Sequence, residues 1–375
     1  MPRTPAPDEG DLDSIPPPHP VFHVEQALLG ALLLDPQHLR DVTGIGPDAF
    51  STAAHGALFA AIRSLPAPDP VEHAKNTKWL AAVLTTAREQ VRGLTAPHLH
   101  SLIQVCPWPR HAPAYARMIE AEHARRRLAA AAQRLTHTAG DTTFPQHMAT
   151  TLTEADALAL VVDDISARFP PHAGSLPRTS TPEPVTAHDE DAVDEERLLL
   201  ATATAHPSDV EQMRWLMPGD FTQPLHAGLW QSLIALTRRH APVDPVTVLW
   251  EARHRGLLGP GAEPRELLDL LAGPVGSPEH WAERVLQRSL LTTIRHVGRR
   301  IEAFTDDPAT TPYQLVVGSR RALADLSAVR TRWHHATASP AQADKTARTR
   351  AAKATAAPRA RPPRATGPPA SRSSR

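Results

Sequence analysis

The stretch "DFTQPLHAGLW", residues 220–230, has a counterpart earlier in the same chain, "AFSTAAHGALF", residues 49–59. When Phe50 is placed on Phe221, the offset is 171 residues. The same offset pairs residues on both sides of the stretch: Glu25 with Glu196, Leu28 with Leu199, His55 with His226, Phe59 with Trp230 and Leu65 with Leu236. A duplicated domain explains these pairs better than chance, so two similar domains are predicted.

Composition limits the class of protein. The 375 residues suffice for two or three domains. The 40 Lys and Arg balance 40 Asp and Glu, which excludes a whole-molecule field that attracts nucleic acid or an anionic membrane. The single cysteine, Cys106, excludes an internal disulfide framework. The N-terminus lacks the basic and apolar regions of a signal peptide, and no apolar run approaches the roughly 18 residues of a membrane helix. We therefore expect a soluble, cytoplasmic protein without membrane contact.

Changes in composition divide the chain into segments. The acidic run from Asp189 to Glu196 follows a proline-rich stretch and is interpreted as linker. The expected segments are a disordered arm (1–20), the first domain (21–168), a Pro-rich and acidic linker (169–193), the second domain (194–335) and a disordered basic tail (336–375).

Hydrophobic spacing predicts helices in both copies. Apolar residues recur at three- and four-residue steps in 24–33, and 58–65 repeats the pattern. In the second copy Asp244 can cap a helix that Pro245 begins and Gly256 ends. No alternating runs typical of strands stand out, so the fold class is expected to be all-α.

Each copy is predicted to finish in an antiparallel helical hairpin. In the second copy a seam with coiled-coil-like spacing consists of Leu290, Ile294, Val297, Ile301 and Phe304. After a turn, residues 312–333 supply the partner helix. The counterparts in the first copy are 113–138 and about 145–168.

Four kinds of segment occur in an order that points to a family. They are "HPVFHVEQALLGALLLDP" (19–36), the pair "PDAFSTAAHGALFAAIRSL" (47–65) and "PGDFTQPLHAGLWQSLIAL" (218–236), "VDPVTVLWEARHRGLL" (243–258) and "HWAERVLQRSLLTTI" (280–294). They resemble, in turn, the E-Q-x-x-L-G helix, the histidine and aromatic signature, the V-D-x-V-T-V segment and the first hairpin helix of the N-terminal domain of DnaB-type replicative DNA helicases. The resemblance covers roughly 20–168 and 194–333. The many arginines beside few lysines look like the codon bias of a high-GC, actinobacterial genome.

This resemblance implies a small helix bundle followed by a hairpin in each copy, with no nucleotide hydrolysis. In the family the domain dimerises through its hairpins, builds a collar ring and docks primase or loader proteins. "EERLLLATATAHP" in copy two lacks the E-Q pair and the glycine, and copy one lacks the T-V run after Val71. The residues that carry the structural signature are Glu25, Gln26, Gly30, Phe50, His55, Phe59, Phe221, His226, Trp230, Asp244 and Trp281.

Other chemistry finds little support in the sequence. The family's motor domain needs a phosphate-binding loop in which Lys follows Gly, and none of the four lysines does so. We therefore expect no ATPase site, no cofactor and no enzyme activity, an unrecognised catalytic site being the remote alternative. Glu120 and His123 have a spacing seen in carboxylate-bridged metal sites, but no second such pair occurs, and a solvated helix face is the simpler interpretation. Cys106 lacks a neighbouring base and is interpreted as an inert thiol.

Two features suggest partners. His55 and His226 recur in both copies, and each is expected to hydrogen-bond the start of a helix rather than to act in catalysis. Residues 345–375 hold nine Lys or Arg and no acid. This tail either contacts nucleic acid without reading its sequence or only solubilises the chain. The residues that would make such contacts are Arg348, Arg350, Lys353, Arg359, Arg361 and Arg364.

The sequence therefore predicts a non-catalytic replication scaffold that binds replicative helicase, primase or loader. Its two hairpins are hypothesised to form an intrachain pseudo-dimer, and the same hairpins are a candidate surface for self-association. The alternative is an accessory nucleic-acid-binding protein that works through the tail.

Overall fold

The computed structural model describes residues 19–143, 146–170, 176–178, 190–259, 263–273 and 276–338. Helices and their connections make up this part of the chain, which contains no strand, so the all-α prediction is confirmed. Residues 1–18 and 339–375 of the predicted disordered arm (1–20) and tail (336–375) lie outside it. At their inner ends the prediction is wrong, because Pro20 begins α1 and residues 336–337 are the end of α14. None of its helices combines the length and the apolar character needed to span a membrane. The chain divides into two compact units, Met1–Val185 with Leu291–Leu326 and Thr186–Leu290 with Ser327–Arg375.

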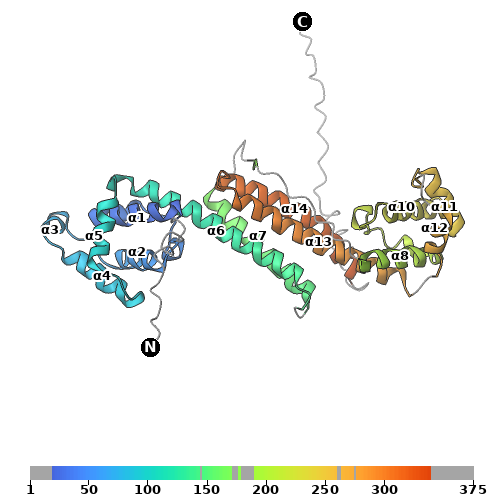
Figure 1. Cartoon of the computed structure of the whole chain (residues 1–375), viewed down its shortest axis with the longest axis horizontal. Helices are drawn as coiled ribbons and strands as arrows, with labels where there is room; N and C mark the ends of the chain where they lie inside the picture. The colour runs from blue at the N-terminus through green and yellow to red at the C-terminus, as the bar shows by residue number, and fades with distance from the viewer. Residues whose placement is uncertain are drawn as a thin grey trace, which may run out of the picture. The chain divides into compact units, whose positions relative to one another are not determined.

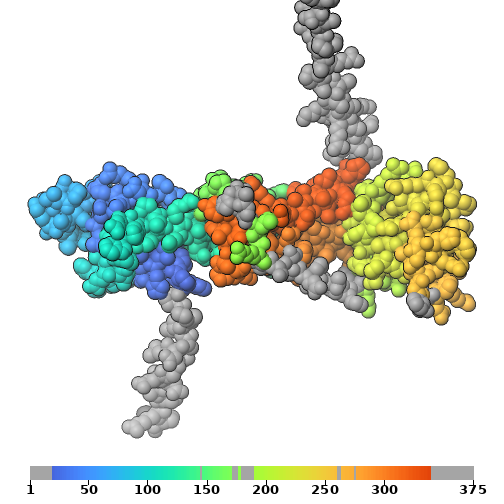
Figure 2. All heavy atoms as spheres, turned by 90° about the horizontal axis from the view of Figure 1, so that it is seen from above, coloured from blue at the N-terminus to red at the C-terminus, as the bar shows by residue number. Residues whose placement is uncertain are grey.

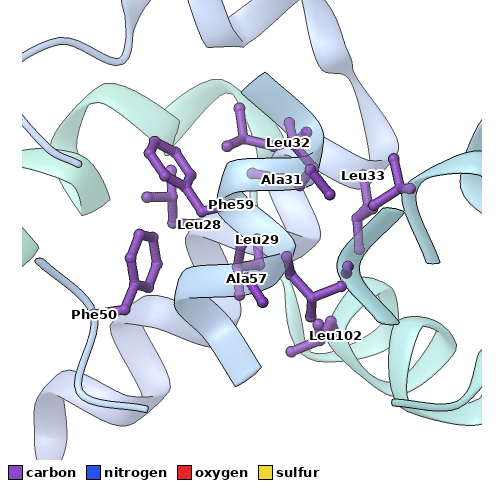
Figure 3. Close-up of a cluster of buried hydrophobic side chains, with 14 of the residues drawn as sticks. Leu28, Leu29, Ala31, Leu32, Leu33, Phe50, Ala57, Phe59 and Leu102 are labelled. Atoms are coloured by element: carbon purple, nitrogen blue, oxygen red, sulfur yellow. The ribbon is translucent and has the colours of Figure 1, made fainter. Parts of the chain in front are cut away.

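The first unit contains a head of short helices (Figure 1). Its elements are α1 (Pro20–Leu34), η2 (Pro36–Asp41), η3 (Pro47–Ala49), α2 (Ala53–Ser64), α3 (Pro70–Lys75), α4 (Lys78–Gln90), α5 (Ala96–Val105) and η4 (Pro109–His111). The predicted leucine spacing of α1 buries Leu28, Leu29, Leu32 and Leu33 completely or nearly so. Figure 3 shows these leucines around Phe59, which lies in the same core.

Gly30 sets how closely α1 approaches α5. A Cβ atom at position 30 would overlap the carbonyl oxygen of Leu102 and lie 2.9 Å from the Cβ of Cys106. Any side chain would therefore push the two helices apart, which explains the glycine of the E-Q-x-x-L-G segment in physical terms.

Two long hairpins follow the heads in sequence. The first hairpin consists of α6 (Ala112–Gly140) and α7 (His147–Arg168), and the second of α13 (Pro278–Asp306) and α14 (Pro312–Thr337). Both match the predicted hairpins within a few residues, apart from the earlier start of α13. In the first unit, α7 and the adjoining parts of α13 and α14 lie together in both views (Figures 1 and 2).

The second unit contains a second head. Its elements are α8 (Glu190–Ala205), α9 (Pro207–Val210), η5 (Pro218–Asp220), α10 (Pro224–Arg238), α11 (Pro245–His254) and α12 (Pro264–Leu271), with the first part of α13 and the last part of α14. Trp230 is completely buried at its centre. As predicted, Asp244 caps α11, accepting hydrogen bonds from the N–H groups of Val246 (2.8 Å) and Thr247 (2.9 Å).

The structure corrects two interpretations of the sequence. Residues 190–193, expected in the linker, form the first turn of α8, and Glu195 and Glu196 of the acidic run are buried on that helix. The compact units also differ from the two sequence copies, because residues 291–326 group with the first copy instead of the second. The second hairpin is therefore shared between the units.

Candidate functional site: paired hairpins and a repeated carboxylate cluster

A buried carboxylate links α1 to the start of α2 in the first head. Oε1 of Glu25 accepts a hydrogen bond from the N–H of Ser51 (2.6 Å), and Oε2 accepts one from its hydroxyl (2.8 Å). Nδ1 of His55 is hydrogen-bonded to the same Oε2 at 2.7 Å. Glu25 is fully buried and His55 is 1% exposed. The carboxylate and the imidazole satisfy each other inside the head, and the exposed Ser51 completes the carboxylate's partners from the surface.

The second head repeats this cluster. Oε1 of Glu196 accepts from the N–H (2.5 Å) and the hydroxyl (2.8 Å) of Thr222. Oε2 accepts from the N–H of Gln223 at 3.4 Å and is hydrogen-bonded to Nδ1 of His226 at 2.6 Å. In both heads the carboxylate lies 30 residues before the histidine. Copy two lacks the E-Q pair, but Glu196 supplies the carboxylate that accepts these hydrogen bonds.

The cluster has the composition of a catalytic triad without its geometry. A nucleophilic serine needs its hydroxyl hydrogen-bonded to the imidazole, whereas Ser51 donates to the carboxylate. The predicted partner of His55 was the start of a helix, and the ring instead bonds Glu25. The first cluster fixes the start of α2 against α1. The second cluster fixes the start of α10 against α8 in the same way.

The remaining signature residues lie in or beside the head cores. Phe50 and Phe59 have ring centroids 4.9 Å apart, and the rings of Phe221 and Trp230 are 6.0 Å apart. Gln26 is half-buried on α1, and Trp281 packs partly buried against the second core. The six tail residues from Arg348 to Arg364 lie outside the described part of the chain.

Charged pairs fasten the long helices to the second head. The carboxylate of Glu195 accepts from Arg284 (3.0 and 2.5 Å) and from Arg288 (3.2 and 2.7 Å) on α13. Asp220, buried at the end of η5, is held by the guanidinium of Arg332 on α14 and by the hydroxyl of Ser289 at 2.7 Å. Such paired, hydrogen-bonded charges fix orientation.

Within the first unit the two hairpins pack on each other, and Arg125 of α6 supplies the most extensive polar contact. Its Nη1 donates to the carbonyls of Thr305 and Asp307, each at 2.8 Å, and its Nη2 donates to the carbonyl of Thr310 at 2.5 Å. The last carbonyls of a helix have no partner within the helix, so a cation there is favourable. One guanidinium from the first hairpin thus closes the turn of the second.

The two hairpins come into close contact between α6 and α13. A Cβ at Gly298 would overlap Oγ1 of Thr136 and lie 3.3 Å from the carbonyl oxygen of Ala132. The same Thr136 hydroxyl donates to Oε1 of Glu302 at 2.7 Å. Glycine on one helix and threonine on the other therefore allow direct contact of the two backbones.

Further contacts join α7 to α14. Arg320 forms an ion pair with Asp163 at 3.3 Å, and the ring of Tyr313 meets Phe169 edge to face at 5.9 Å. The sequence had indicated both hairpins but not Arg125, Thr136 or Gly298. The apolar seam of α13 indicated that this helix packs on another helix, but not which one. Contacts between segments more than 160 residues apart leave no local pattern in the sequence.

The other sequence candidates hold no ligand-binding constellation. Glu120 is buried and bonds Arg117 at 2.8 Å, so the prediction of a solvated helix face is wrong for this residue. Burial lowers the pKa of His123, as do three nearby arginines, while Asp48 opposes them. Burial raises the pKa of the Cys106 thiol. Across the described residues, no three His, Cys, Asp or Glu side chains are grouped to hold a metal ion.

Two helical heads with the same buried cluster, followed by hairpins that pack together, define a tandem all-helical architecture. The family model for the DnaB-like helicase N terminal domain matches residues 17–121 and 188–286. These two segments make up more than half of the chain, which therefore belongs to the DnaB-like helicase N-terminal domain family. The double match confirms the tandem duplication. The two matched segments end inside α6 and inside α13. The remaining parts of both hairpins are therefore assigned from the structure alone. No curated protein and no solved structure was found to match.

Proposed function

We propose that this chain is a non-catalytic interaction protein of DNA replication that binds the replicative helicase or its primase. Membership of the helicase family supports a role related to that machinery. The observation that carries the proposal is the packing of α6 and α7 on α13 and α14 inside one chain. In relatives of the kind it resembles, hairpins of two separate chains pair to build the collar.

A covalent pair of hairpins differs physically from a pair formed by two chains. Linkage turns association into an intramolecular step with a high effective concentration, so the pair persists at dilutions where separate domains come apart. The two heads are then free to present their surfaces to a partner without a ring having to form. In this proposal the chain acts in the cytoplasm, as a collar-like unit that helps or competes with the helicase's own collar.

The test uses the purified full-length chain with replicative helicase and primase from the same organism. Sedimentation first determines whether the chain is a monomer at micromolar concentration, as an internal pseudo-dimer requires. Binding is then measured by interferometry with nuclease present. Saturable binding of helicase or primase supports the proposal, and binding of neither rejects it.

A second function is favoured by one feature of the sequence, the basic tail. A full-length variant in which Arg348, Arg350, Lys353, Arg359, Arg361 and Arg364 are all replaced by Gln separates the two. If the tail is the working part, this variant loses a salt-dependent affinity for single-stranded DNA. If the scaffold is the working part, the variant keeps its protein partner.

A further inference from the structure

A groove lies on the surface of the second head. It has a volume of about 520 Å³ and lies between the segment that follows α9, the outer side of α10 and the end of α11. Its floor is apolar, with buried Val210 and Leu216, half-buried Ile234 and Met217, whose surface is 50% exposed. A methionine left this open offers an adaptable apolar contact.

Arginines surround this floor. Arg214, Arg238, Arg239 and Arg255 line the groove, and all four are exposed. Two carboxylates lie among them: Glu211 is 3.5 Å from Arg214, and Glu251 is shared by Arg239 (2.5 Å) and Arg255 (2.9 Å). Four guanidiniums against two carboxylates leave the rim with a positive excess.

The turn after α10 holds two of the arginines in place. The N–H of Ala241 donates to the carbonyl of Leu236 at 3.0 Å, and His240 adopts a left-handed conformation with φ of 52°. This is the geometry of a helix C-terminal turn. Arg238 and Arg239 therefore project from an ordered helix end instead of a loose loop.

The first head has an arginine at the position that corresponds to Ile234 of the groove floor. The 171-residue offset puts Arg63 on Ile234 and Ile45 on Leu216. Nη1 of Arg63 donates to the carbonyl of Ile45 at 3.3 Å, so its side chain lies across the position of the groove floor. Copy two has exchanged this arginine for an apolar residue.

The connection after the helix differs as well. It runs from Leu65 to Pro70 in copy one and from Leu236 to Pro245 in copy two, which is four residues longer and contains Arg238 and Arg239. The second copy thus differs from the first both at the apolar floor and at the basic rim.

We propose that this groove binds a segment of a partner protein in which apolar side chains are flanked by Asp and Glu. Carboxylates pair with guanidiniums in two-pronged, charge-assisted hydrogen bonds, while the apolar side chains cover Ile234 and Met217. A nucleic acid fits less well, because no aromatic side chain lines the groove for base stacking. The inference concerns the chemistry of the occupant and stands whether or not the partner is the helicase or primase.

The test measures fluorescence anisotropy of labelled peptides with the full-length chain. The probe is a synthetic 14-residue peptide with Leu at helical spacing and Glu or Asp elsewhere. A peptide with Lys in place of the acids, one with Ser in place of Leu, and single-stranded DNA of equal length serve as comparisons. The acidic, Leu-containing peptide is expected to bind tightest.

Three variants locate the site. Arg238→Glu should weaken binding of the acidic peptide roughly tenfold or more, as expected for the loss of a charge-assisted contact. Ile234→Arg places the residue of copy one on the apolar floor, and should weaken binding because the leucines of the peptide lose the apolar surface that they cover. Arg265→Glu makes the same charge change on exposed α12, outside the groove, and should have little effect. Arg238→Glu changes an exposed residue, so its effect does not depend on the fold tolerating Ile234→Arg.

The proposal is overturned if the acidic peptide does not bind, if Arg265→Glu weakens it as much as Arg238→Glu does, or if single-stranded DNA competes for the groove with equal affinity.

Discussion

Replacement of Gly298 by Ala tests the pairing of the hairpins with one methyl group. The added Cβ would overlap Oγ1 of Thr136 and lie 3.3 Å from the carbonyl oxygen of Ala132. The Thr136 hydroxyl lies 3.0 Å from the carbonyl oxygen of Ala132 and 2.7 Å from Oε1 of Glu302, and its single proton is donated between these two acceptors. The overlap is therefore relieved either by turning Thr136, which costs this hydrogen bond, or by moving α6 away from α13.

The magnitude follows from two opposing effects. Overpacking costs about 1–3 kcal/mol. Alanine in place of glycine within a helix returns up to about 1 kcal/mol. Because the added Cβ would overlap Oγ1 of Thr136, the cost of overpacking belongs at the upper end of its range, about 3 kcal/mol. We therefore expect a net loss of about 2 kcal/mol in the free energy of separating the hairpins, a factor of roughly 30 in that equilibrium.

Hydrogen exchange followed by mass spectrometry gives the assay, since it resolves peptides from 291–306 and from the heads separately. Exchange in 291–306 should accelerate in Gly298→Ala. Gly140→Ala is the matched control, because no atom lies within 4 Å of a Cβ there. Adding Thr136→Ala to Gly298→Ala should recover part of the loss. If Gly298→Ala protects α13 as well as the wild type does, the close contact that defines the paired hairpins does not exist.

Three further predictions concern the heads and the turn. Glu196→Ala leaves buried His226 and two backbone N–H groups without an acceptor, and should destabilise the second unit by about 3–5 kcal/mol in urea unfolding while leaving exchange in α1 unchanged. Arg125→Ala removes three hydrogen bonds to carbonyl oxygens of this turn and should raise exchange around residues 305–310, whereas the same change at exposed Arg92 should not. Burial, with the charge of His55, lowers the pKa of His98. The unfolded chain then binds the proton more readily, so stability falls as pH drops below about 6.5. His98→Gln should flatten this decline in the urea midpoint, and an unchanged slope would contradict it.

Local patterns predicted the elements well where local physics decides them. Asp244 followed by Pro245 predicted the start of α11 from two adjacent residues. The apolar spacing of α13 predicted which of its residues are buried. The sequence also identified His55 and His226 as repeated residues. Their partners were harder to find, because Glu196 stands in a run of acids that is typical of a solvated linker. The usable signal was the repeat, which aligned Glu25 with Glu196 and kept both 30 residues before a histidine.

The shared second hairpin could not be predicted in the same way. Whether residues 291–326 pack with their own copy or with the other depends on contacts such as Arg125 with Thr310, which join segments 185 residues apart. No periodicity in either segment encodes that choice.

The two hairpins differ in the size of the side chains that they bury. The buried positions of α6 between 124 and 139 are four alanines, Ala124, Ala131, Ala132 and Ala139, together with Leu128, Leu135 and Thr138. The buried seam of α13 instead carries Leu290, Ile294, Val297, Ile301 and Phe304. A helix of small side chains packs densely against one of large side chains, whereas pairing two alanine faces leaves voids and pairing two large faces overpacks. Two identical hairpins from separate chains cannot make this choice, since both would carry the same face. Duplication within one chain removed that constraint, and the difference in side-chain size favours the internal pair over exchange between molecules.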